Sequence, residues 1–117
     1  MLIQRSGIYV ANLDPGHGTE PGKTRPVVVI QTDLLNHTGH MSTIICPLTT
    51  KVRKNAPLFR VHIPKGGSGL SEDSDIMVDQ IRAIDNRRLR EYIGKLSADQ
   101  MMELLTTLKS LLDMGWV

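Results

Sequence analysis

The sequence predicts a mainly β fold, a small and mostly antiparallel barrel with a helix packed against it. Short apolar runs separated by polar loops follow one another over residues 7–84, which is typical of closely spaced strands. Helical spacing of leucines comes only near the end of the chain. At 117 residues the chain is long enough for one hydrophobic core, so we expect a single domain over residues 1–117.

Five runs are predicted as strands from their apolar content or alternation: 7–13, 26–31, 42–48, 58–63 and 75–84. Pro26 is expected at the first position of its strand, where a missing N–H costs least. In the fifth run, Gln80 and Arg82 share a face with the apolar Ile76, Val78 and Ile84. Two polar residues on such a face are either satisfied core groups or the lining of a groove.

Two helices are predicted after the strands. Asp85 is expected to cap a short helix over residues 86–93, which Gly94 would end. Ser97 and Gln100 have the spacing of a capping box, and this box opens the terminal helix. The apolar stripe of that helix is Met101, Leu104, Leu105, Leu108, Leu111 and Leu112.

The composition narrows the class of protein. Cys46 is the only cysteine, so an internal disulfide and a cysteine-based zinc site are excluded, and a cytoplasmic location in a reducing compartment is expected. We expect neither a signal peptide nor a membrane-spanning segment. The net charge of +2 permits an acidic partner without requiring one. Because aromatic residues are only 3% of the chain, a nucleic-acid site cannot rest on a row of stacked rings.

The histidines raise the possibility of acid–base catalysis. RNA cleavage needs a base for the 2′-hydroxyl and an acid for the leaving 5′-oxygen. His62 reads as an ordinary strand residue, and His37 and His40 as solvated loop residues. His17 is better placed, inside a glycine-rich loop, although a non-catalytic role is the commoner one for any single histidine. No metal-ligand or nucleotide-binding motif is present, and no cofactor is expected.

Arg25 stands between the loop "GTEPGK" and the strand "PVVVI". A guanidinium can hold phosphate oxygens in a bidentate fork and suits the charge of a developing phosphorane. A salt bridge to Asp14 or Glu20 is the competing interpretation. At the end of the third predicted strand, Thr49 and Thr50 offer two hydroxyls, which also occur as plain turn residues.

Four segments, taken in order, resemble a MazF/PemK-type toxin of a bacterial toxin–antitoxin module. They read "GIYVANLDPGHGTEPGKTRPVVVIQTD", "IICPLTT", "DSDIMVDQIRAIDNRRL" and "IGKLSADQMMELLTTLKSLL". The arginine–proline–valine strand, the P-L-T segment and "DQIRAID" are specific motifs, whereas the terminal helix is not. The resemblance implies an SH3-like barrel of the CcdB/MazF superfamily, a homodimer, and a metal-independent ribonuclease acting on single-stranded RNA. Such cleavage leaves a 2′,3′-cyclic phosphate and a 5′-hydroxyl.

The resemblance also implies roles for individual residues. Arg25 matches the catalytic arginine of the family, and Thr49 matches its P-L-T threonine, with Thr50 as an alternative. Glu20 matches the acidic residue of the loop pattern G-S-E-Q-G-G, in which this chain has Thr19 and Pro21 at the serine and glutamine positions. The expected RNA-binding residues are His17, Lys23, Gln31, Thr50, Lys51, Ser74, Asp79 and Gln80, with Arg53 and Lys54 as further phosphate contacts. The acceptor of the 2′-proton is left between Glu20 and His17.

The resemblance further implies an antitoxin partner, whose acidic and partly disordered segment would lie near Arg25. The dimer would use the terminal helix and nearby strands. A CcdB-like gyrase poison of the same fold is the main alternative, suggested by the tail "MGWV" with Trp116. A catalytically silent barrel that binds RNA or an antitoxin is the third.

Overall fold

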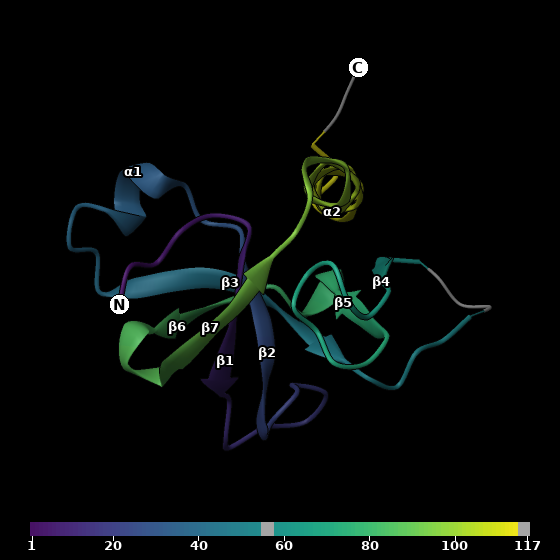
Figure 1. The fold of residues 1–117 in the computed structure, drawn as a ribbon, viewed down its shortest axis with the longest axis horizontal. Helices are drawn as coiled ribbons and strands as arrows, with labels where there is room; N and C mark the ends of the chain where they lie inside the picture. The colour runs from purple at the N-terminus through teal and green to yellow at the C-terminus, as the bar shows by residue number, and fades with distance from the viewer. Residues whose placement is uncertain (55–57, 115–117) are drawn as a thin grey trace.

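The computed structural model describes residues 1–54 and 58–114, and it confirms the predicted fold class (Figure 1). Seven strands form one curled antiparallel sheet in the order β4-β5-β3-β2-β1-β7, and β6 pairs with β3 beside this path. The strands are β1 Gly7–Asn12, β2 Thr24–Val29, β3 Ser42–Thr49, β4 Arg60–Ile63, β5 Ser74–Met77, β6 Arg82–Asp85 and β7 Leu89–Lys95. The pairings between these described residues leave the sheet open, with β4 and β7 at its ends.

The central strands bury both of their faces. Val28 and Cys46 contribute to an apolar cluster under the terminal helix α2 (Ala98–Leu111), whereas Val27 and Val29 contribute to a second cluster on the other face. This explains why "PVVVI" is a continuous apolar run, because a strand covered on both sides has no polar face. The two clusters make β2 and β3 the rigid centre of the molecule.

The terminal helix begins as the sequence predicts. Ser97 accepts a hydrogen bond from the N–H of Gln100, and the Gln100 side chain accepts one from the N–H of Ser97, which confirms the capping box. Met101 and Leu104 are buried against β4 and the 3-10 turn that follows β5. The apolar stripe of α2 is therefore used at least partly within the chain itself.

The predicted helix over residues 86–93 is wrong. Asp85 does cap a turn, because its carboxylate accepts the N–H of Arg87, but that turn is the single 3-10 turn η2 (Asn86–Arg88). The chain then continues as β7 along β1, with Tyr9 opposite Tyr92. The local cap and the later glycine suggested a helix, but pairing with the free edge of β1 overrides that preference.

The predicted strand over 75–84 is also wrong as one element. It divides into β5 and β6, with the 3-10 turn η1 (Val78–Gln80) between them. β5 pairs with the end of β3 at Leu48 and Thr49, and β6 pairs with its beginning up to Ile45. Pro47 lies in the gap between these two pairings and has no N–H to donate, so an uninterrupted ladder cannot run past it. The expected common face of residues 76–84 does not exist.

The other strand predictions are confirmed with shifted ends. β2 begins at Thr24 rather than Pro26, and Pro26 is tolerated because β3 pairs only with Val27–Val29. Gln31 lies beyond β2, and the connection that follows contains the short helix α1 (Asp33–Asn36). The tail residue Trp116 lies outside the described residues. Within the described ranges, no helix is long and apolar enough to cross a membrane.

Candidate active site at the ends of β2 and β3

Arg25 lies near the start of β2, opposite Ala11 of β1, and its side chain is half-buried. Its Nε donates to the carbonyl oxygen of Gly22 at 2.9 Å, and its Nη1 donates to the carbonyl oxygen of Leu48 at 3.2 Å. None of the ion pairs within residues 1–54 and 58–114 includes Arg25, so the salt bridge to Asp14 or Glu20 does not form. The guanidinium is thus oriented by the neutral carbonyl groups of Gly22 and Leu48.

Thr49 is the last residue of β3 and follows the residue whose carbonyl holds Arg25. Its side chain is partly exposed, and its Oγ1 accepts a hydrogen bond from the N–H of Lys51 at 3.2 Å. The structure therefore brings Arg25 and Thr49 to the same end of neighbouring strands. Thr50 lies beyond the strand and is exposed. Because Thr49 is held by the ladder, the geometry favours it over Thr50 as the site threonine.

The loop between β1 and β2, residues 13–23, lies beside this site, at the bottom of the view in Figure 1. The loop is folded on itself: a Cβ atom on Gly16 would lie 2.9 Å from the backbone nitrogen of Gly22. The N–H of Glu20 donates to the carbonyl of His17 at 2.9 Å, so these two residues share one turn. Their side chains and that of Lys23 are exposed. The expected Glu20, His17 and Lys23 thus lie in the loop whose Gly22 carbonyl holds Arg25.

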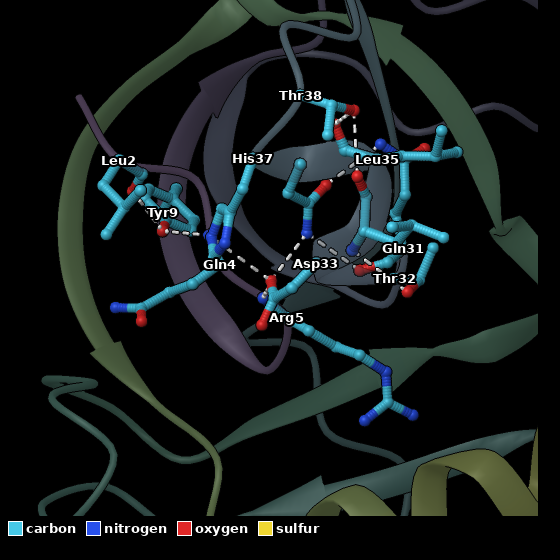
Figure 2. A network of polar contacts seen from close by, with 12 residues as sticks. Leu2, Gln4, Arg5, Tyr9, Gln31, Thr32, Asp33, Leu35, His37 and Thr38 are labelled. Carbon is cyan, nitrogen blue, oxygen red and sulfur yellow. Dashed lines mark hydrogen bonds and ion pairs between the residues drawn. The ribbon is translucent and has the colours of Figure 1, made fainter.

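Gln31 is buried, and its side-chain amide bonds to other groups of the protein. It is 5% exposed, and its Nε2 donates to Asn36 Oδ1 and to the carbonyl of Ser42, both at 3.0 Å. Its Oε1 accepts the N–H of Ile44 at 3.1 Å. Figure 2 shows this amide inside the polar network around α1 and the N-terminal segment. The expected RNA-binding role of Gln31 is therefore not supported, because its amide is already occupied by protein.

Ser74 is likewise 2% exposed, and its hydroxyl donates to the carbonyl of Glu72 at 3.1 Å. The expected RNA-binding role of Ser74 is therefore not supported, because its hydroxyl is buried and bonded within the chain. Asp79 and Gln80 lie in η1, the turn opposite the middle of β3, where Asp79 is exposed and Gln80 is half-buried. Burial, with a smaller effect of the Asp79 charge, raises the pKa of the Cys46 thiol to about 12. Cys46 is therefore a protonated core residue and not a nucleophile.

The structure also reveals a polar hub behind Thr49, centred on Asp75. Asp75 is opposite Thr49 in the β3–β5 ladder and is 2% exposed. Its Oδ2 accepts the backbone N–H of Arg53 at 3.0 Å and Nη1 of Arg60 at 3.1 Å, and its Oδ1 lies 3.1 Å from Nδ1 of His62. The same Nη1 of Arg60 donates to the carbonyl of Lys51 at 3.1 Å. The hub thus holds the segment that follows Thr49.

Burial raises the pKa of Asp75, but the hydrogen bonds from Arg53, His62 and Arg60 outweigh it and leave the pKa below its usual range. The hub borders a cavity of about 450 Å³. Its lining residues are Val52, Arg53, Lys54, Arg60, His62, Asp73, Asp75 and Glu103. The sequence contained one usable signal for this hub, the alternation of Arg60 and His62 on one face of a predicted strand. Their acidic partner could not be found without the register of β5.

Within the described residues, no group of three or more histidine, cysteine, aspartate or glutamate side chains is arranged to hold a metal ion. A fixed guanidinium and a threonine hydroxyl can donate to an anionic substrate, and exposed Glu20 and His17 can exchange a proton.

Comparison with known proteins gives a family match over residues 4–112, to the PemK-like, MazF-like toxins of type II toxin–antitoxin systems. Among solved structures, the toxin MazF-mt6 of Mycobacterium tuberculosis is 25% identical with a TM-score of 0.78, over 94% of this chain and 99% of its own. MazF in a MazE–MazF crystal structure from Deinococcus radiodurans is 28% identical with a TM-score of 0.76, over 98% of this chain and 99% of its own.

An endoribonuclease of a mycobacterial species, in complex with its cognate antitoxin, is 19% identical with a TM-score of 0.80. That alignment covers 98% of this chain and 99% of the other, and at this identity the likeness concerns the fold. The family match, by contrast, includes the Arg25 strand, the segment that ends in Thr49, and the turn and strand after β5. The chain therefore belongs to the PemK-like, MazF-like toxin family of type II toxin–antitoxin systems.

Proposed function

We propose that this protein is a metal-independent endoribonuclease that cleaves single-stranded RNA as the toxin of its module. The observation that carries the proposal is Arg25, a cation fixed by two backbone carbonyls next to Thr49 and left without a carboxylate partner among the described residues. Family membership supports the toxin role, and the mycobacterial protein of the same fold is an endoribonuclease.

In the proposed reaction the 2′-oxygen of the RNA attacks the adjacent phosphorus. The bond between phosphorus and the 5′-oxygen breaks, which gives a 2′,3′-cyclic phosphate and a 5′-hydroxyl. Arg25 binds the scissile phosphate and stabilises the phosphorane, and Thr49 donates to a non-bridging oxygen. A preorganised donor of this kind typically lowers the barrier by about 2.7–4 kcal/mol. No enzyme nucleophile is needed, because the substrate supplies its own.

Two protons must move in this reaction. The 2′-hydroxyl loses one to a base, for which the exposed loop offers Glu20 and His17. The 5′-oxygen gains one as it leaves, for which Arg25 and solvent are the available donors. The Glu20 side chain is exposed, so its carboxylate can approach a bound nucleotide.

A single-stranded substrate suits this geometry. In-line attack requires a splayed nucleotide, and base edges can then be read by hydrogen bonds. Phosphate contacts come from exposed residues just before the start of β2 and just after the end of β3. These are Lys23, Thr50, Lys51, Arg53 and Lys54. Asp79 and Gln80 remain in the proposed RNA surface through their position in η1.

We further propose two protein partners. The first is an antitoxin whose acidic, partly disordered segment folds across the site near Arg25. The MazE–MazF complexes of Deinococcus radiodurans support this partner. The second is another copy of this chain, and the expected homodimer rests on the family.

The alternatives make different predictions. A CcdB-like gyrase poison is not favoured, because the family match is to PemK-like and MazF-like toxins. The tail that suggested it falls outside the described residues. A catalytically silent RNA-binding barrel would retard RNA in a gel without creating new ends.

The test is cleavage of a long single-stranded RNA in EDTA by wild-type protein, Arg25→Ala and Arg5→Ala. Arg5 is a control of the same charge, and its backbone N–H, not its guanidinium, bonds to Asp33. We expect Arg25→Ala to lose at least about 100-fold in rate while its circular dichroism spectrum is unchanged, and Arg5→Ala to cleave normally. Full activity of Arg25→Ala would refute the proposed site, and no cleavage by wild-type protein would refute the proposed function.

A further inference from the structure

The loop over residues 13–23 must be held in place for the proposed site to work. It carries Glu20 and His17, and its Gly22 carbonyl is one of the two acceptors that orient Arg25. A backbone hydrogen bond from the N–H of Leu13 to the carbonyl of Lys23 closes the loop at 2.9 Å. The side chains of residues 14–20 are exposed.

Arg88 reaches the stem of this loop from a distant part of the chain. It is the last residue of η2 and is half-buried. Its Nη1 donates to the carbonyl of Asn12 at 3.2 Å and to the carbonyl of Asp14 at 3.1 Å. These carbonyls lie at the end of β1 and the start of the loop, so a single cation holds the point where the chain leaves the sheet.

A chain of hydrogen bonds leads from Arg88 to Arg25. Arg88 fixes the backbone of Asp14, and the carboxylate of Asp14 accepts the backbone N–H of Lys23 on the returning side of the loop. Lys23 follows Gly22, whose carbonyl accepts Nε of Arg25. A shift of Asp14 would therefore move the acceptor that sets the direction of the Arg25 guanidinium.

The neighbouring Arg87 shows that this arrangement is specific to one arginine of the turn. Arg87 pairs with Asp85 at 3.0 Å, and its side chain is 91% exposed. Within the described chain its hydrogen bonds go to Asp85 alone, and none reaches residues 12–23. The two adjacent arginines thus differ in burial and in partners, and only Arg88 bonds to the loop stem.

We propose that Arg88 is a positioning residue for RNA cleavage, which acts by fixing the stem of loop 13–23 and thereby the orientation of Arg25. The effect of Arg88 on the cleavage rate rests on the proposed function. Its hold on the loop stem does not depend on any activity. Arg88 touches neither Arg25 nor, in this account, the substrate.

The test compares Arg88→Ala, Arg88→Lys and the matched control Arg87→Ala with wild-type protein. Single-turnover cleavage of a single-stranded RNA separates the rate at saturation from the concentration at half-saturation. Amide hydrogen exchange is followed at Leu13 and Lys23. We expect Arg88→Ala to lose about 10–100-fold in saturating rate with a smaller change in half-saturation, because misplacement of a catalytic group by about 1 Å has effects of that size.

In Arg88→Ala the amides of Leu13 and Lys23 should exchange faster, while Arg87→Ala matches wild-type protein in both measurements. Arg88→Lys should recover part of the rate, because an ammonium can still donate to one of the two carbonyls. Equal rates in Arg88→Ala and Arg87→Ala would overturn the proposal, as would unchanged exchange at both amides. If wild-type protein does not cleave RNA, the proposed function fails, and the exchange measurement alone decides whether Arg88 fixes the stem.

Discussion

At Arg25, backbone carbonyls take the place that a carboxylate would have in a salt bridge. Gly22 and Leu48 orient the guanidinium but carry no charge, so its electrostatic attraction for a phosphate is preserved. A carboxylate at the same position would compete with the substrate. Within the described residues Arg25 forms no ion pair, so no carboxylate of the protein occupies the position where a phosphate would bind.

Asp75 gives a prediction about acid stability. Its pKa is lowered in the folded state, so its contribution to stability is complete above its unfolded pKa of about 3.9 and is lost as pH falls through the folded pKa. At pH 7, Asp75→Asn should lower the free energy of unfolding by about 1–3 kcal/mol, because Arg60 and the Arg53 N–H lose their charged acceptor.

Urea unfolding at several pH values measures this effect. The difference between wild-type protein and Asp75→Asn should shrink below about pH 4. Glu91→Gln, which removes an exposed carboxylate on β7, serves as the control and should leave stability nearly unchanged at pH 7. A difference that stays constant from pH 7 to pH 2 would contradict the pKa direction assigned to Asp75.

The candidate residues differ in how far the sequence could predict their surroundings. The position of Arg25 follows from local features, a glycine-rich loop that meets a strand buried on both faces. The setting of Gln31 and Asp75 depends on which residues face them across the sheet. No short-range pattern specifies that register, so the burial of Gln31 and the hub at Asp75 required the structure.

At the level of elements, β7 shows how pairing overrides local preference. Residues 89–95 have a cap before them and a glycine near their end, yet they form a strand beside β1. Gly94 has a different role from the predicted helix stop. A Cβ atom there would collide with the backbone carbonyl of Ser68, whose loop crosses β7.

This contact predicts that Gly94→Ala destabilises the fold. The added methyl group meets backbone, which cannot rotate away, so we expect a loss of about 1–3 kcal/mol in unfolding free energy. Gly67→Ala is the matched control in the same crossing loop, because a Cβ atom there would have no neighbour within 4 Å. Thermal denaturation of both variants decides the matter. Equal midpoints would show that the loop does not pack on β7 as described.

The division of the fifth predicted strand is caused by a single residue, Pro47, in the strand with which it pairs. Pro47 was visible in the third run, but its effect falls on a partner strand far along the chain. Only when β5 and β6 are known to share β3 does the missing N–H explain the turn between them. The resulting turn η1 carries Asp79 and Gln80, so the interruption also shapes the proposed RNA surface.

In the molecule as a whole, two segments distant in sequence meet at one end of the central strands. The loop 13–23 and the segment after Thr49 are each tied down by a side chain of another element, Arg88 for the first and Arg60 for the second. The two apolar clusters hold β2 and β3 between these segments. The site is thus carried by a rigid centre and completed by exposed loops.

The proposed assembly can be measured in solution. Sedimentation at micromolar concentration should give a dimer, and an added acidic antitoxin segment should inhibit cleavage by wild-type protein. We expect the dimer to use α2 and nearby strands, with Met101 and Leu104 of α2 already buried within the chain. A monomer at these concentrations would contradict the homodimer.

The central claim is that the substrate's own 2′-hydroxyl is the nucleophile at the Arg25 site. The most direct test uses an RNA with one mapped cleavage position and a matched RNA in which only the nucleotide before that bond carries a 2′-deoxyribose. The account predicts cleavage of the first RNA, with a 2′,3′-cyclic phosphate and a 5′-hydroxyl, and loss of cleavage at that bond in the second. Continued cleavage of the 2′-deoxy bond would contradict it, because water or a protein group would then be the nucleophile.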